Sequence, residues 1–171
     1  MAKKKGQQLN SIADTLIPPD PTDPAATTLE LDEMWSFVAK KVQQHWIWLA
    51  SCRKTRQVVA YAIGARNTAT CRKLWRAIPN VYRTGTCSTD FWQAYAAVIP
   101  DEQHEPVGKE TGETAHIERF NNTIRQRLAR FVRKTVSFSK SPDMHTSCLH
   151  LFLWRYNMEI RCKWMDTMRA V

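Results

Sequence analysis

The stretch from His116 to Val132 constrains the fold of this 171-residue chain more than any other. Read as a helix, it places its apolar residues at spacings of three and four, which gives one continuous stripe. The stripe consists of Ile117, Phe120, Ile124, Leu128 and Phe131. Glu118 and Arg125 lie together on a second face, because residues seven apart stack on a helix. The stretch therefore predicts a helix over 116–132 with a core face and a carboxylate above a cation.

A third ridge of the same predicted helix is basic. It is formed by Arg119, Gln126, Arg130 and Arg133. The whole chain is also basic, with 25 Lys and Arg against 16 Asp and Glu and a formal net charge of +9. Nucleic acid is the default partner of such a domain and an acidic membrane the second choice, although charge alone also fits simple solubility. A carboxylate beside outward-pointing arginines suggests chemistry on a polyanion.

The cysteines and the apolar runs indicate the cellular compartment. The five cysteines form no C-x-x-C motif, and no Cys/His spacing matches a zinc site, so we expect reduced and mostly buried thiols. The chain shows no signal peptide and no apolar run long enough for a membrane span. We expect a cytoplasmic protein, nucleoid-associated when bound to DNA, with no membrane partner.

The composition divides the chain into three segments. Residues 1–28 contain a lysine run at Lys3–Lys5 and a proline-rich stretch at Pro18–Pro24, and are expected to form a flexible basic tail. Residues 29–157 are expected to form the folded domain. Residues 158–171 are expected to be a helical extension or a tail.

Alternation of apolar residues predicts strands at 29–38, 45–51 and 57–64. The polar turns between them, 39–44 and 52–56, are short, so the three strands should form an antiparallel meander. The pattern then alternates between helix and strand. We predict a Thr68-capped helix to residue 78, a parallel strand at 81–88, a helix at 91–98, a strand near 104–107, the 116–132 helix and a last helix from Ser141. This order is typical of the ribonuclease H-like α/β fold, a mixed sheet flanked by helices.

Asp32 lies within an otherwise apolar strand. Burying a carboxylate there costs on the order of several kcal/mol. A bound metal ion would offset this cost. An exposed strand position or a pair with an arginine would explain Asp32 equally well. Glu30 and Glu33 are nearby competitors for the same role.

Asp90 and Glu118 have simpler explanations when taken singly. Asp90 follows the fourth strand and could cap the next helix. Glu118 could interact with the helix dipole or pair with Arg119 or Arg125. The predicted topology nevertheless brings both to the edge where Asp32 lies, since ligand sites in such sheets lie at carboxyl ends of strands. Three converging carboxylates favour a magnesium site.

Three motifs carry a family resemblance. LELDEMWSF contains Asp32, CSTDFWQAY contains Asp90, and HIERFNNTIRQRLAR contains Glu118. Together with WIWLASCRKTR and RKTVSFSKSP, they resemble the DDE transposases of the insertion sequence 1 family. The resemblance covers about residues 29–157.

The resemblance implies that Asp32, Asp90 and Glu118 are the catalytic, metal-binding triad, with two Mg²⁺ ions or Mn²⁺ as a substitute. It implies strand cleavage at transposon ends and transfer of the 3′ hydroxyl into target DNA. Arg125 matches a basic position expected to grip the transposon end. The outer basic residues Arg119, Arg130 and Arg133, with Lys134, are expected to bind the DNA backbone. Such a bacterial enzyme would act as at least a dimer on DNA.

The resemblance fails at the N-terminus. Relatives of this kind carry a zinc-finger and helix-turn-helix region that reads the element's ends, and no such finger is present here. A zinc-finger partner or fusion is therefore expected, and the lysine run could mark a ribosomal frameshift site. Two other functions stay open: a catalytically idle, DNA-binding or inhibitory fragment, and a ribonuclease H-type nuclease, which fits the fold but not the motifs.

Overall fold

The computed structural model describes residues 11–132, 134 and 136–169 and centres on a mixed sheet with the strand order β3-β2-β1-β4-β5. The strands are β1 (Leu29–Val38), β2 (Lys40–Cys52), β3 (Val58–Gly64), β4 (Cys87–Thr89) and β5 (His104–Pro106). The first three are antiparallel, whereas β4 is parallel to β1 and β5 is parallel to β4. This is the predicted ribonuclease H-like α/β fold.

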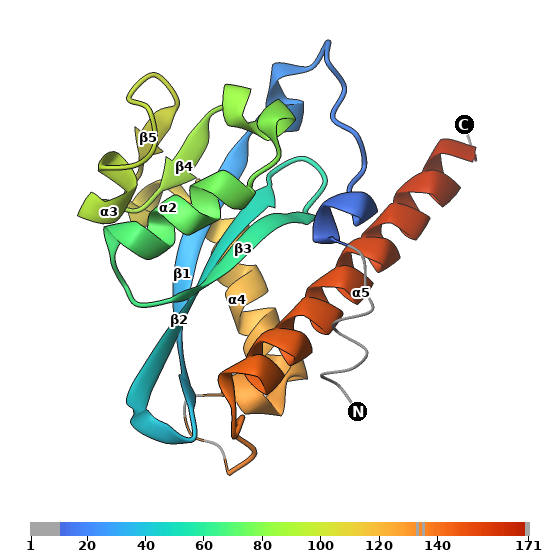
Figure 1. Ribbon diagram of the computed structural model, residues 1–171. Helices are drawn as coiled ribbons and strands as arrows, with labels where there is room; N and C mark the ends of the chain where they lie inside the picture. The colour runs from blue at the N-terminus through green and yellow to red at the C-terminus, as the bar shows by residue number, and fades with distance from the viewer. Residues whose placement is uncertain (1–10, 133, 135, 170–171) are drawn as a thin grey trace.

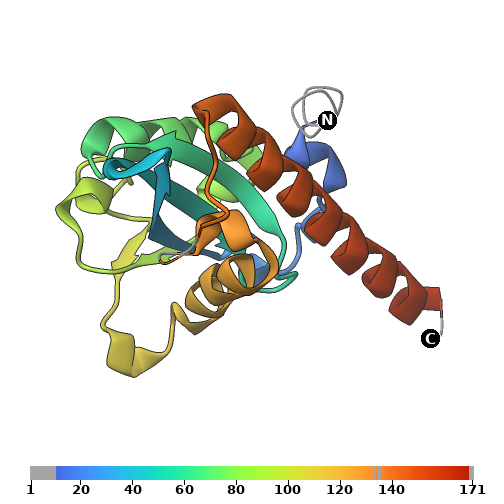
Figure 2. The same cartoon turned by 90° about the horizontal axis from the view of Figure 1, so that it is seen from below.

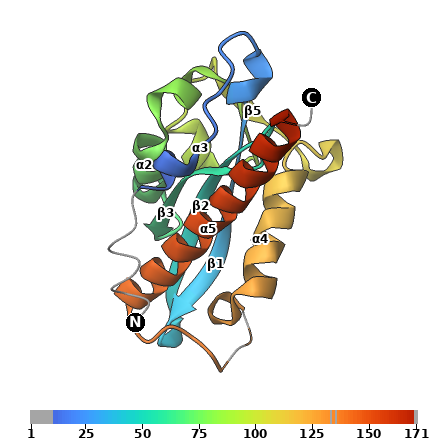
Figure 3. The same cartoon turned by 90° about the vertical axis from the view of Figure 1, so that its right-hand side faces the viewer.

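Helices cover both faces of the sheet (Figure 1). They are α2 (Thr68–Ala77), α3 (Gln93–Ala96), α4 (Ala115–Arg127) and α5 (Pro142–Arg169). Figure 3 shows α4 and α5 side by side on one face, with α2 and α3 beyond the other. Within the described residues, no helix has the length and apolar character that crossing a membrane requires.

Two apolar cores lie on opposite faces of the sheet because successive strand residues point in opposite directions. Leu31 and Trp48 pack with Leu74 and Tyr95 on the α2 and α3 side. Met34 packs with Ile117, Ile124 and other residues of α4 and α5 on the opposite side. The apolar stripe predicted for the Glu118 helix is thus what holds α4 on the sheet.

The predicted polar turn at 39–44 is wrong, because β2 already begins at Lys40. Val38 pairs with Lys40 across a very tight reversal, and Ala39 adopts a left-handed backbone with φ 60°. Residues 40–44 are exposed, so this end of the β1–β2 hairpin lacks the burial that makes a strand visible in sequence.

The predicted strand at 81–88 is also wrong over most of its length. Residues Asn80–Thr84 form the 3-10 helix η3, and only Cys87–Thr89 join the sheet. Pro79 precedes η3, and Tyr82 within η3 has a buried side chain. The short β4 nevertheless runs parallel to β1, as predicted.

The predicted helix over 116–132 ends early. Leu128 has an extended backbone, with φ −118° and ψ 94°, and Ala129–Phe131 form the separate 3-10 turn η5. This turn brings the buried Phe131 onto the ring of His145, with 4.3 Å between centroids. Arg119 lies on α4 and Arg130 on η5, so the two side chains do not form one ridge of a single helix.

Two helix starts differ in detail from the prediction. Asn67, not Thr68, caps α2, since its side chain accepts a hydrogen bond from the Thr70 amide at 3.0 Å. The predicted helix at 91–98 is reduced to the short α3, which begins two residues after Phe91.

The division at residues 28 and 157 stays a prediction. The described part of the first segment contains the 3-10 helices η1 (Ile12–Thr15) and η2 (Pro24–Thr27), and Ile12 is buried. α5 runs without interruption through residue 157, and its C-terminal end extends beyond the sheet (Figure 2).

A buried amide joins η1, β3 and α5. Asn157 donates from Nδ2 to the Val58 carbonyl at 2.8 Å and to Thr15 Oγ1 at 3.0 Å. Its Oδ1 accepts from the Val58 amide at 2.8 Å. Gln57 Nε2 donates to the carbonyls of Thr15 and Asn157, both at 3.0 Å. These bonds satisfy backbone groups that have no access to water.

Replacing Asn157 with Ala should lower the free energy of unfolding by about 3 kcal/mol, because it removes the side-chain partner of the buried amide and carbonyl groups of Val58. Urea denaturation measures the loss. Gln126→Ala, an exposed amide on α4, is the control and should change stability by no more than about 0.5 kcal/mol. Equal stabilities of the two variants would contradict the role given to Asn157.

Candidate active site

β1 presents acidic side chains to both faces of the sheet. Asp32 points toward α4, where its Oδ2 accepts a hydrogen bond from Asn121 Nδ2 at 2.6 Å. Glu33 points to the opposite side, where its Oε2 accepts from the Tyr95 hydroxyl at 2.7 Å. The alternation of the strand therefore sends adjacent carboxylates to different helices.

Asp90 follows β4 directly. The register of β1 and β4 pairs Leu29 with Cys87 and Glu30 with Ser88. Continued by two residues, this register brings Asp90 beside Asp32. Asp90 also caps the following turn, since its Oδ1 accepts from the Trp92 amide at 3.0 Å.

Glu118 lies in the first turn of α4, and its Oε1 accepts from Thr114 Oγ1 at 3.2 Å. The position of this turn is fixed by Glu30, which is fully buried on β1. Glu30 Oε2 accepts from the amides of His116 and Ile117 at 3.1 and 3.0 Å. These amides lack partners within the helix, and a negative charge is favourable at a helix N-terminus.

Arg53 extends this anchor to the neighbouring elements. Its Nε lies 3.2 Å from Glu30 Oε1, while Nη2 donates to Ser88 Oγ on β4 at 3.0 Å. Nη2 also donates to the Glu113 carbonyl at 2.7 Å, just before α4. One ion pair thus ties together the three elements that carry Asp32, Asp90 and Glu118.

The three predicted carboxylates line one pocket of about 320 Å³. Arg66, Arg125, Thr114, Asn121 and Asn122 line it as well. Asn121 is buried, and its Oδ1 has no hydrogen-bond partner among the described residues. Oxygen donors of this kind fit a hard divalent cation such as Mg²⁺. The catalytic and metal-binding roles of the three carboxylates stay predictions.

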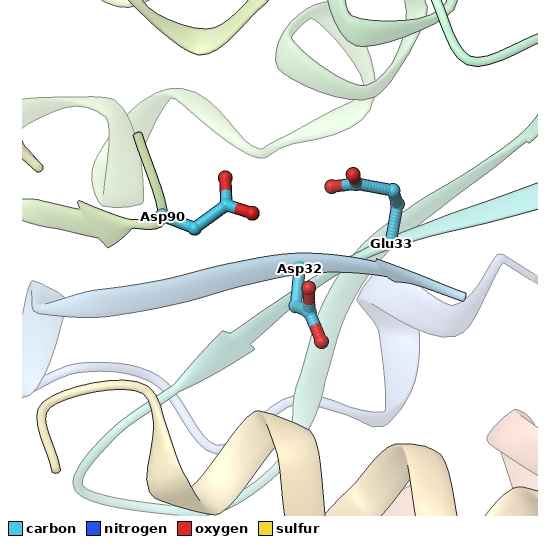
Figure 4. Close-up of side chains that lie close together, drawn as sticks. All are labelled: Asp32, Glu33 and Asp90. Atoms are coloured by element: carbon cyan, nitrogen blue, oxygen red, sulfur yellow. The ribbon is translucent and has the colours of Figure 1, made fainter. Parts of the chain in front are cut away.

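Glu33 adds a fourth carboxylate, which sequence reasoning considered only as a competitor of Asp32. One carboxylate oxygen each of Asp32, Glu33 and Asp90 lie within 4.8 Å of one another. Figure 4 shows Glu33 and Asp90 turned toward each other on one side of β1 and Asp32 on the other. The sequence signal was an acidic residue next to Asp32 in an apolar strand.

Glu33 is held by a cation that two aromatic rings position. Arg66 donates from Nε to Glu33 Oε1 at 2.7 Å, and its Nη2 lies 2.6 Å from the same oxygen. The guanidinium of Arg66 lies 4.8 Å from the centroid of Trp46 and 4.2 Å from that of Trp92. Burial raises the pKa of Glu33, whereas Tyr95 and Arg66 lower it. Glu33 therefore supports the pocket wall through an ion pair.

The pKa of Asp32 is raised by its surroundings. Burial, and then the charge of Glu33, raise its pKa to about 7, and Asp90 and Glu118 add to the rise. A cation bound among these groups would offset this repulsion, which is a second reason why the pocket fits a metal ion.

The described residues that are predicted to bind DNA lie at different places, and their role stays a prediction. Arg125 lines the carboxylate pocket, whereas Arg119 lines a different pocket. Arg130 and Lys134 are exposed beyond the end of α4. Arg133 lies outside the described residues.

In metal-free buffer, the contribution of Asp32 to stability should decrease as the pH rises from 5 to 8. The unfolded chain ionises Asp32 near its usual pKa of 3.8, whereas the folded protein keeps it neutral up to about pH 7. The stability from this raised pKa is complete below pH 3.8 and is lost as the pH rises through about 7. Asp32→Asn should remove about 2 kcal/mol of this decrease in urea denaturation. Asp166→Asn, exposed near the end of α5, should behave like the wild type. An unchanged decrease in Asp32→Asn would contradict the raised pKa.

The sequence was also compared with known proteins. Residues 25–158 match the family model described as IS1 transposase. The chain is 39% identical over 133 residues to the insertion element iso-IS1n protein InsB of Shigella dysenteriae, covering 77% of this chain and 97% of that protein. It is 36% identical over 124 residues to the insertion element IS1 protein InsB of Shigella flexneri, covering 72% and 92%. For the IS1 4 protein InsB of Escherichia coli strain K12, the identity is 35% over 124 residues, and 72% of each chain is covered. The chain belongs to the IS1 transposase family.

Proposed function

We propose that this chain is a DDE transposase that cuts DNA at the ends of an insertion element and joins the freed 3′ hydroxyl to target DNA. The observation that carries the proposal is the meeting of Asp32, Asp90 and Glu118 in one pocket. These residues come from a central strand, the end of its parallel neighbour and a covering helix. Membership of the IS1 transposase family supports the same reading.

Asp32, Asp90 and Glu118 would hold two Mg²⁺ ions, or Mn²⁺ in their place. When bound, the ions supply Lewis-acid chemistry at the oxygens of a phosphodiester. Asn121 orients the Asp32 carboxylate and Thr114 that of Glu118 through the hydrogen bonds described above. The protein thus keeps its oxygen donors in place before DNA binds.

Two displacements at phosphorus account for the reaction. In the first, a water oxygen bonds to the phosphorus at the element's end, the bond from phosphorus to the 3′ oxygen breaks, and that oxygen leaves as a 3′ hydroxyl. In the second, this hydroxyl bonds to a target phosphorus, loses its proton and expels the 3′ oxygen of the target strand. Arg125, in the same pocket, would bind the phosphate of the transposon end.

The reaction defines the partners that we propose. Both the transposon end and the target are DNA, and Arg119, Arg130, Arg133 and Lys134 would contact its backbone. Two ends must be joined in one complex, so we propose at least a dimer on DNA. A zinc-finger module, as a partner or a fusion, would supply recognition of the end sequence.

Glu118→Gln should abolish Mg²⁺-dependent cleavage of element-end DNA and leave DNA binding intact, because the change removes a charged ligand but little volume. Single-turnover cleavage and fluorescence anisotropy measure the two activities. We expect a fall in rate of at least about 100-fold, and the same loss for the wild type in EDTA. Glu102→Gln, an exposed carboxylate, is the control and should cut normally. Undiminished cleavage by Glu118→Gln would refute the assignment, and an inactive wild type would favour the idle DNA-binding fragment.

A further inference from the structure

A second pocket, of about 260 Å³, lies between α4, α5 and the turn that joins β2 to β3. Its basic lining comes from Arg56 in the turn and Arg119 on α4, with His116 beside them. Ser51, Thr123 and Tyr156 add hydroxyl groups. Among the described residues, none that lines this pocket is acidic. None of them also lines the carboxylate pocket, so the two pockets are separate.

The charge near this pocket is positive. The carboxylate of Glu30 lies near Arg56, but it is already engaged by the first amides of α4 and by Arg53. Arg53 in turn is shared between Glu30 and Glu113. Arg56 Nη1 lies 3.9 Å from Glu30, a longer contact, and Arg119 is exposed. Arg56 and Arg119 therefore leave an excess of positive charge at the pocket.

The basic residues continue along the helix. Tyr156 also lines a neighbouring pocket of about 450 Å³, which Arg127 and Arg155 line as well. Arg155 is offset by Glu159, 2.9 Å away, but Arg127 adds to the positive charge. Arg119 and Arg127 are about 12 Å apart along α4. This distance spans several phosphates of one DNA strand, which recur every ~3.4 Å along the axis.

We infer that the pocket lined by Arg56, Arg119 and His116 binds a backbone phosphate of duplex DNA away from the reacting phosphodiester. Two arginines supply the charge, and Ser51 and Tyr156 supply hydroxyl groups. The length of the basic path favours a polynucleotide over a single free phosphate. The inference rests on the proposed function only for DNA as the partner, and binding here requires neither metal nor cleavage.

The test measures binding of a random-sequence DNA duplex to the full chain by fluorescence anisotropy, in EDTA, between 50 and 200 mM salt. Arg119→Gln and Arg56→Asn each remove one charge, and Asn tolerates the left-handed backbone of residue 56, where φ is 66°. Each variant should flatten the plot of log K against log salt by about 1 unit of slope. Arg72→Gln and Arg76→Gln, exposed on α2 across the sheet, remove the same charge and should keep the wild-type slope.

Two further measurements distinguish the outcomes. Arg119→Lys keeps the charge and should restore the slope, which separates lost contact from misfolding. The binding assay contains EDTA and measures no cleavage, so failure of the catalytic proposal leaves this test intact. An unchanged slope in Arg56→Asn and Arg119→Gln, or an equal fall in the α2 variants, would overturn the inference. So would inorganic phosphate raising the Tm of the wild type alone while the DNA slope stays unchanged, because it would show a site for a free anion.

Discussion

The buried contact between Glu30 and the first turn of α4 is the interaction on which the arrangement of the pocket depends. Glu30 lies two residues before Asp32 on the same strand, and its carboxylate binds the amides of His116 and Ile117. Arg53 balances its charge and reaches Ser88 on β4 and Glu113, two residues before α4 begins. A fully buried carboxylate is tolerated because both of its oxygens accept hydrogen bonds, Oε1 from Arg53 and Oε2 from the two amides. Removing either partner would leave an uncompensated charge at the junction of β1, β4 and α4.

The pocket brings several carboxylates together, and their surroundings stabilise the charged forms of Glu33 and Asp32 to different degrees. Glu33 has a dedicated cation in Arg66, which two tryptophan rings hold in place. Asp32 accepts from the side-chain amide of Asn121, but burial and the neighbouring carboxylates raise its pKa to about 7. The protein therefore balances the charge of Glu33 with Arg66, whereas a bound cation would favour the ionised form of Asp32. Such local instability is typical of functional sites.

The sequence was sufficient for the sheet order because its cues are local: apolar alternation for β1 to β3 and a helical crossover before β4. The pattern also indicated the meeting of Asp32, Asp90 and Glu118, since parallel strands share an edge. The pattern could not show that the helix is interrupted at Leu128. Phe131 continues the helical spacing of apolar residues, but it belongs to the separate turn η5, where its side chain is buried. Nor could it show the start of β2 at Lys40, where exposed polar residues carry no strand signal. The approach of Glu33 to Asp90 depends on tertiary contacts with Arg66 and Tyr95 that no local pattern encodes.

The anchoring of α4 at one end has a mechanical consequence. Glu30 holds the helix at His116 and Ile117, and α4 ends at Arg127. Glu118 lies only about 2 Å along the axis from this pivot, whereas Arg125 lies about 12 Å from it. A small tilt of the helix would thus displace Arg125 several times further than Glu118. In the proposed function, such a tilt would let Arg125 adjust its contact with a phosphate to different DNA shapes while the position of Glu118 changes little.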